Sequence, residues 1–84
     1  MRVFDIFCGA GGFSHGMQQA GIQVVGGADI WVKATDTFQE AFPHARVFTC
    51  DVSQSAVRDE IVAFCEAQGV DVIVGGPPCQ VLFA

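Results

Sequence analysis

A cysteine held in a stiff loop is the residue of this chain best suited to covalent chemistry. Cys79 lies in the run Gly-Gly-Pro-Pro-Cys-Gln, residues 75–80, directly after an apolar segment at 70–74. The two prolines restrict the backbone of this run and fix where the thiol is presented. A thiolate is a strong nucleophile when neighbouring groups lower the pKa of the thiol. Cys79 is therefore a candidate nucleophile, with packing as the alternative role that a free cysteine often has.

A glycine-rich run near the N-terminus is suited to holding a ligand. Residues 5–14 read Asp-Ile-Phe-Cys-Gly-Ala-Gly-Gly-Phe-Ser. Glycines in a turn between a strand and a helix let a ligand approach the backbone closely. Ser14 stands where the dinucleotide fingerprint requires its third glycine, and no Gly-Lys-Ser/Thr of a phosphate-binding loop is present. The run therefore favours a nucleoside ligand without a pyrophosphate, and the alternative is glycines that serve only a tight turn.

Two carboxylates follow expected strands and could bind the polar groups of a nucleoside. Asp29 comes twenty residues after Gly9, where a carboxylate can accept hydrogen bonds from both ribose hydroxyls. Asp51 closes the third expected strand and could accept a hydrogen bond from an adenine amino group, or it could cap the following helix. Trp31 could border the adenine or pack in the core, and the sequence leaves both open.

The elements that would position these residues alternate regularly along the chain. The sequence predicts strands at 3–8, 22–28, 46–50 and 70–74, and helices at 13–20, 32–42 and 53–68. Gly21, Pro43 and Gly69 stand where the helices are expected to end, and Ser53 is a plausible N-cap of the third helix. Strict alternation predicts a parallel sheet with right-handed crossovers, whose ligands bind at the carboxyl ends of the strands.

Composition and charge restrict what these 84 residues can do alone. Hydrophobic residues make up 51% and charged residues 15%, a balance that suits one piece of a larger protein better than a small free-standing domain. The net charge is -5 and the basic residues are scattered, so the chain alone should bind DNA poorly. The fourth strand would form an apolar sheet edge, which favours association with another chain.

The four cysteines indicate a reducing compartment. None belongs to a Cys-x-x-Cys pair and no histidine stands at ligand spacing, so we expect free thiols and no metal site. The sequence shows no signal peptide and no apolar run long enough to span a membrane. We therefore expect a cytoplasmic or nucleoid-associated protein that is not secreted.

Taken together, the runs at 5–14 and 75–80 resemble the first and fourth motifs of DNA cytosine-5 methyltransferases, in the same order and spacing. The resemblance covers nearly the whole chain. It implies an enzyme of DNA methylation, as in restriction–modification, that transfers a methyl group from S-adenosyl-L-methionine to carbon 5 of cytosine. Residues 1–84 would then be a partial catalytic domain. Its fold class would be α/β, the N-terminal half of a class I (Rossmann-like) methyltransferase fold, with a parallel sheet of about four strands and flanking helices.

The resemblance also implies roles for individual residues. By position, the cofactor would contact Phe7, Gly9, Gly11, Gly12, Asp29, Ile30, Asp51, Val52 and Pro78. Among these, Asp29 takes the place of a ribose-binding acid that is usually Glu in the family, so its reach is shorter. Ile30 would pack on the adenine and Asp51 would bind its amino group. Cys79 would be catalytic, attacking carbon 6 of a cytosine flipped out of the DNA.

The sequence departs from the family after Gln80. The family usually continues with a small residue, Phe and Ser, whereas this chain reads Val-Leu-Phe-Ala at 81–84. The resemblance places the segments that read DNA and assist the chemistry beyond residue 84, so we expect the isolated chain to be inactive. One alternative is a non-catalytic remnant or association module that dimerises or docks to a complementary chain. Another is half of a nucleotide-binding oxidoreductase, which the Pro-Pro-Cys-Gln run disfavours.

Overall fold

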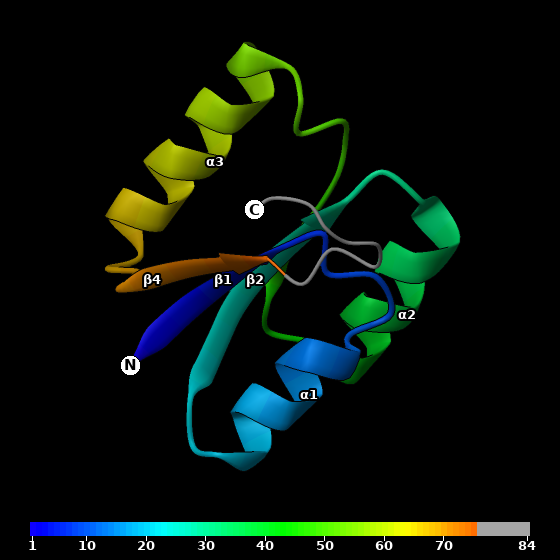
Figure 1. The fold of residues 1–84 in the computed structure, drawn as a ribbon, viewed down its shortest axis with the longest axis vertical. Helices are drawn as coiled ribbons and strands as arrows, with labels where there is room; N and C mark the ends of the chain where they lie inside the picture. Colours follow the sequence, from blue (N-terminus) through cyan, green and yellow to red (C-terminus); the bar gives the residue numbers. More distant parts are fainter. Residues whose placement is uncertain (76–84) are drawn as a thin grey trace.

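Strands and helices alternate along the chain, as the sequence patterns predict. A computed structural model describes residues 1–75. Its elements are β1 (Arg2–Ile6), α1 (Gly12–Gln19), β2 (Gln23–Asp29), α2 (Val32–Ala41), β3 (Arg46–Thr49), α3 (Ser55–Ala67) and β4 (Val72–Gly75) (Figure 1). Pro78 and Cys79 lie outside the described residues.

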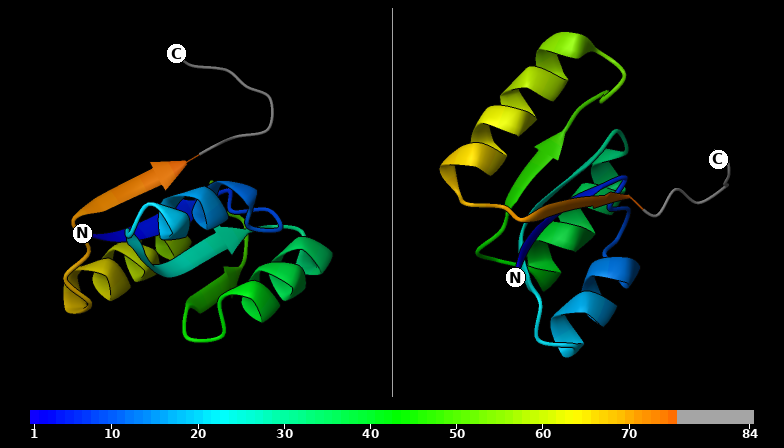
Figure 2. Two further views of the ribbon diagram at one scale, coloured as in Figure 1. Left: turned by 90° about the horizontal axis from the view of Figure 1, so that it is seen from below. Right: turned by 60° about the vertical axis from the view of Figure 1, so that its left-hand side comes forward.

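The four strands form one parallel sheet in the order β3-β2-β1-β4. The chain moves outward from β1 to β3 and then crosses back to β4 on the other side of β1. Right-handed connections place the helix of this return crossing on the opposite face from the first two helices. Accordingly α3 covers one face of the sheet and α1 and α2 cover the other (Figures 1 and 2). The expected Rossmann-like arrangement is confirmed.

Each face of the sheet has its own apolar core. Under α3, the rings of Phe4, Phe48 and Phe64 form a triangle with centroids 5.7–6.0 Å apart. On the other face, Phe38 and Phe42 of the α2 segment pack 4.7 Å apart beside Cys8. Aromatic contacts of this kind contribute beyond the area they bury.

Two adjacent glycines in β2 make room for these aromatic cores. A Cβ atom at Gly26 would lie 2.8 Å from the Phe4 ring and 2.7 Å from the Arg46 carbonyl oxygen. At Gly27 a Cβ atom would lie 2.8 Å from the Phe38 ring. Glycine weakens strand propensity, and the β1–β2 register shifts between Val3 and Phe4, yet each glycine of this pair admits a large ring against β2.

Several predicted element ends are shifted, and one predicted cap is wrong. The first strand ends at Ile6 because Phe7 already has a φ of 62°. The third helix begins at Ser55, and Gln54 occupies its N-cap position without a side-chain hydrogen bond. Ser53 is therefore not the N-cap. Instead its backbone N–H donates to the Asp51 carboxylate at 3.0 Å, which forms a turn before the helix.

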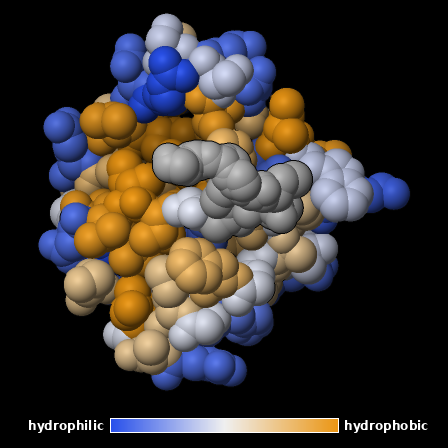
Figure 3. Space-filling view, viewed as in Figure 1, coloured by the Kyte–Doolittle hydropathy of each residue, from blue (hydrophilic) through white to orange (hydrophobic). Residues whose placement is uncertain are grey.

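The last described strand borders an apolar surface. Within residues 1–75, β4 pairs only with β1, and the side chains of Val72 and Ile73 are 41% and 44% exposed. Val62 of α3 is 46% exposed, and it lines a groove together with these two residues of β4. Figure 3 shows hydrophobic side chains gathered over β4 and the adjacent part of α3. None of the helices in the described part of the chain is long and apolar enough to cross a membrane.

Candidate functional site

The glycine-rich turn after β1 is built from left-handed backbone. Phe7, Gly9 and Gly11 have φ angles of 62°, 54° and 105°. Glycine adopts this conformation freely, whereas for Phe7 it stores about 1–2 kcal/mol of strain. The Phe7 side chain is 45% exposed, at the carboxyl end of β1. A strained residue with an exposed aromatic ring is the kind of feature found at ligand sites.

The carboxylate of Asp29 connects this turn to the end of β2 through hydrogen bonds. Its Oδ2 accepts a hydrogen bond from the Gly9 N–H at 2.9 Å, and its Oδ1 accepts one from the Trp31 N–H at 3.1 Å. One side chain therefore joins the turn to the start of α2. An ionised carboxylate has about four acceptor positions, so two remain for further donors. The role in holding the turn was not predicted from the sequence.

The three glycines of the turn have different surroundings. Cβ atoms built at Gly9 and Gly12 would meet nothing within 4 Å. A Cβ atom at Gly11 would lie 3.1 Å from the Phe42 ring and 3.3 Å from the Phe38 ring. Gly9 and Gly12 therefore leave open space over the turn, while Gly11 lets the backbone pack onto the α2 aromatic core.

A buried carboxyl–hydroxyl pair lies beneath the turn. The Ser14 hydroxyl donates a hydrogen bond to Asp5 Oδ2 at 2.6 Å, and the two residues are 0% and 1% exposed. Burial raises the pKa of Asp5, the Ser14 hydrogen bond opposes this, and the Asp29 charge adds to it. Asp5 Oδ1 has no hydrogen-bond partner among the described residues. The pair fixes the first turn of α1 against β1.

The end of β3 lies beside Asp29 and completes the candidate site at the carboxyl ends of the strands. The Cys50 N–H donates to the Asp29 carbonyl oxygen at 2.9 Å, which brings Asp51 beside the end of β2. Two hydrogen bonds from Ser53 lower the pKa of Asp51. Ile30 is 69% exposed, whereas Val52 packs against the core under α3. The carboxyl ends of three neighbouring strands thus bring together the predicted residues Phe7, Gly9, Gly12, Asp29, Ile30 and Asp51.

The described cysteines are poor nucleophiles. Burial, reinforced by the charges of Asp5 and Asp29, raises the pKa of Cys8 to about 12. Burial also raises the pKa of Cys50 and of Cys65. All three thiols are free and are protonated at neutral pH. The prediction for Cys79 concerns a residue outside the described part and stays a prediction.

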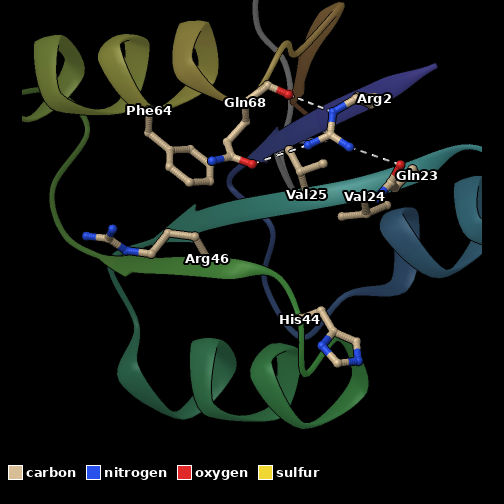
Figure 4. Close-up of a pocket in the computed structure, with 8 residues that line it drawn as sticks. All are labelled: Arg2, Gln23, Val24, Val25, His44, Arg46, Phe64 and Gln68. Atoms are coloured by element: carbon tan, nitrogen blue, oxygen red, sulfur yellow. Dashed lines mark hydrogen bonds between the residues drawn. The ribbon is translucent and has the colours of Figure 1, made fainter.

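A second hollow lies at the opposite, amino ends of the strands (Figure 4). The Arg2 guanidinium crosses it and donates to the Gln68 carbonyl oxygen at 2.6 Å and to the Gln23 side chain at 3.2 Å. The Arg46 guanidinium lies 4.4 Å from the centroid of the Phe48 ring. Both guanidinium groups interact with other groups of the protein. The hydrogen bonds of Arg2 therefore connect β1, β2 and the end of α3, and the hollow does not offer an unpaired charge to a ligand.

The fold and the carboxyl end of the sheet described above define a Rossmann-like α/β protein. The sequence model of the family "C-5 cytosine-specific DNA methylase" matches residues 1–82. The chain belongs to this family.

Relatives extend the same conclusion. Type II methyltransferase M.HgiDI of Herpetosiphon aurantiacus is 38% identical over 80 residues, covering 95% of this chain and 25% of its own length. DNA (cytosine-5)-methyltransferase 1 of Mus musculus is 34% identical over 89 residues, covering 95% of this chain and 6% of its own. The chain therefore spans a quarter or less of these two proteins.

Solved structures share the fold. A protein described as a DNA modification methyltransferase of an Escherichia coli prophage matches with a TM-score of 0.77 and 34% identity, over 95% of this chain and 23% of its own. A mutant of Spodoptera frugiperda DNMT2 matches with a TM-score of 0.73 at 21% identity, over 99% of this chain and 24% of its own. The second likeness shows the fold alone.

Proposed function

We propose that this chain forms the cofactor-binding half of a DNA cytosine-5 methyltransferase, with S-adenosyl-L-methionine as the methyl donor. The observation that carries the proposal is the hydrogen bond that the Asp29 carboxylate accepts from the glycine-rich turn, at the carboxyl ends of the strands. This edge is where open α/β sheets bind ligands. The family match over residues 1–82 supports the same assignment.

The residues at this edge fit the parts of the cofactor. Asp29 has acceptor positions left for the ribose hydroxyls. The open space over Gly9 and Gly12 suits the methionine portion, and exposed Ile30 suits the adenine. Asp51 would accept a hydrogen bond from the adenine amino group, with Val52 beside it. When bound, S-adenosyl-L-methionine supplies an electrophilic methyl group.

The target would be cytosine in DNA, attacked by Cys79. Addition of a thiolate to carbon 6 makes carbon 5 nucleophilic, and a flipped-out base makes these atoms accessible. The raised pKa values of Cys8, Cys50 and Cys65 leave those thiols unsuited to this role. Pro78, next to Cys79, would border the cofactor.

Methylation by residues 1–84 alone is not expected. The net charge of -5 disfavours contact with DNA phosphates, and the chain covers only 25% of M.HgiDI. We infer that further polypeptide supplies the DNA contacts and completes the site.

Calorimetric titration with S-adenosylhomocysteine, the product of methyl transfer, tests the cofactor site. The full chain should bind, and Asp29→Asn should weaken binding because one acceptor of the carboxylate is lost. Asp36→Asn removes an equal charge from the exposed side of α2 and should leave binding unchanged. No binding by a folded sample, shown by circular dichroism, would overturn the cofactor assignment.

A second candidate function is association through β4. Strands of parallel sheets are ordinarily covered on both faces, yet Val72 and Ile73 are more than two-fifths exposed. We infer that a second copy or a complementary chain covers this surface. Sedimentation of the chain at increasing concentration tests self-association, which Ile73→Lys should abolish. A monomer at every concentration would leave only the complementary chain.

A further inference from the structure

A buried threonine joins α2 to the end of β3 through its hydroxyl group. Thr35 of α2 is 1% exposed, and its Oγ1 lies 2.7 Å from Oγ1 of Thr49, the last residue of β3. The same Thr35 hydroxyl donates to the Val32 carbonyl oxygen at 3.0 Å. A hydroxyl group has one hydrogen, so both bonds form together only when Thr49 donates to Thr35. Within residues 1–75, no other side-chain hydrogen bond joins α2 to a strand.

This pair belongs to a closed ring of hydrogen bonds and one peptide link around Asp29. The Thr35 N–H donates to the Trp31 carbonyl oxygen at 3.0 Å, and the Trp31 N–H donates to Asp29 Oδ1 at 3.1 Å. On the other side, Cys50 follows Thr49 in the chain, and its N–H donates to the Asp29 carbonyl oxygen at 2.9 Å. Asp29 and Thr49 are also partners in the β2–β3 register. The ring therefore connects the threonine pair to both the backbone and the carboxylate of Asp29.

The Asp29 carboxylate needs support of this kind because it is only partly buried. The hydrogen bond that its Oδ1 accepts from the Trp31 N–H is exposed to water, which weakens it. That bond persists only while the start of α2 stays close to the end of β2. A side chain whose orientation is fixed before the ligand arrives loses less conformational freedom on binding, so the ligand binds more tightly.

We propose that Thr35 and Thr49 are positioning residues, which hold the start of α2 on the end of β3 and thereby orient the Asp29 carboxylate for its ligand. The inference rests on the proposed function, since it assigns the support of the same site. Both hydroxyls act through Asp29 and neither contacts the ligand. Without the pair, α2 would still pack through Phe38 and Phe42 further along the chain, so the helix would persist while its start becomes free to shift.

Thr35→Val tests the pair with little change of shape, because valine keeps the branched side chain and lacks the hydroxyl. The affinity of the full chain for S-adenosylhomocysteine, measured by calorimetry, should fall about 3- to 10-fold, as expected for the loss of one hydrogen bond. Thr35→Ser keeps the hydroxyl, and its affinity should stay within about twofold of the original.

Thr37→Val provides a matched control on the same helix. The Thr37 hydroxyl donates to the Lys33 carbonyl oxygen at 3.1 Å, but Thr37 is exposed and has no hydrogen bond to a strand within the described residues. The substitution therefore removes a similar bond within α2 without affecting the ring around Asp29. Its affinity for S-adenosylhomocysteine should stay within about twofold of the original.

Two further measurements separate positioning of Asp29 from support of the fold. The Trp31 amide should exchange its hydrogen faster in Thr35→Val than in Thr37→Val, while amides in the centre of β1 keep their rates. In an Asp29→Ala background, Thr35→Val should lower the affinity by less than about twofold, because the carboxylate through which Thr35 acts is absent. A residue that only supports the fold would lower the affinity by the same factor in both backgrounds.

The outcomes distinguish this inference from the proposed function. If Thr35→Val binds S-adenosylhomocysteine as tightly as Thr37→Val and its Trp31 amide exchanges no faster, the positioning role is overturned and the cofactor site stands. An equal loss of affinity with and without the Asp29 carboxylate would also overturn the positioning role. If the folded original chain binds no S-adenosylhomocysteine at all, the proposed function fails, and the role of the threonine pair in binding fails with it.

Discussion

Removing the Asp29 carboxylate should loosen the glycine-rich turn and destabilise the whole chain. Asp29→Ala deletes two hydrogen bonds, one to the partly buried Gly9 N–H and one to the exposed Trp31 N–H. Bonds to a charged acceptor contribute about 1.5–3 kcal/mol each, and exposure to water reduces this. We take about 1.5–2 kcal/mol for the Gly9 bond and about 0.5 kcal/mol for the Trp31 bond. The free energy of unfolding should therefore fall by about 2–2.5 kcal/mol.

Urea unfolding and amide hydrogen exchange measure this loss at two levels. With a denaturant dependence of about 1 kcal/mol per molar, typical of a small domain, the unfolding midpoint should fall by about 2 M. The Gly9 amide should exchange faster than amides in the centre of β1, because its acceptor has gone. Asp29→Asn keeps one carbonyl oxygen, so one of the two hydrogen bonds can persist. Its free energy of unfolding should fall by about half as much as that of Asp29→Ala.

A matched charge change provides the control. Asp36→Ala removes a carboxylate from an exposed position of α2 that makes no side-chain hydrogen bond within the described residues, so its effect should lie within about 0.5 kcal/mol. If Asp29→Ala unfolds at the same urea concentration as Asp36→Ala and the exchange rate of the Gly9 amide is unaltered, the hydrogen bonds of Asp29 do not stabilise the turn.

Four further predictions concern the core, helix α1 and a buried thiol. Burial raises the folded pKa of Asp5, so the stability it contributes is present at low pH and is lost as pH rises through that pKa. Asp5→Asn should therefore gain stability over the original chain as pH increases, and a stability difference that is flat with pH would contradict this. Gly26→Ala forces a Cβ atom within 2.8 Å of the Phe4 ring and should cost about 3 kcal/mol in urea unfolding. Gly16→Ala, with nothing within 4 Å, should instead stabilise α1 by up to about 1 kcal/mol. Cys8, with a pKa of about 12, should resist thiol reagents at neutral pH until the protein is unfolded, as peptide mass mapping would show.

Much of the fold could be predicted because its signals are local. Apolar segments separated by Gly21, Pro43 and Gly69 define the alternation of strands and helices, and the structure confirms all seven elements. The placement of Asp29 at the carboxyl end of β2 could be predicted because the end of an apolar strand is visible in the sequence alone. Parallel strands then bring such ends to one edge without further information.

The remaining features depend on contacts between distant segments. Asp5 and Ser14 each look ordinary in the sequence, and only the packing of α1 on β1 brings their side chains to 2.6 Å. Gly11 shares a motif with Gly9, yet its inward role depends on Phe42, about thirty residues later. Ser53 has the right chemistry for a cap, but the turn set by Asp51 delays the helix by two residues.

The sheet order has a consequence for how the chain folds. β1 lies between β2 and β4, so during synthesis β1 acquires one neighbour early and the other only after about seventy further residues. Closing so long a loop costs entropy that local helix formation does not, which delays the β1–β4 pairing. The bonds from Arg2 to Gln68 form only at that stage. During synthesis, the side of β1 that will receive β4 therefore stays open until the last described strand has left the ribosome.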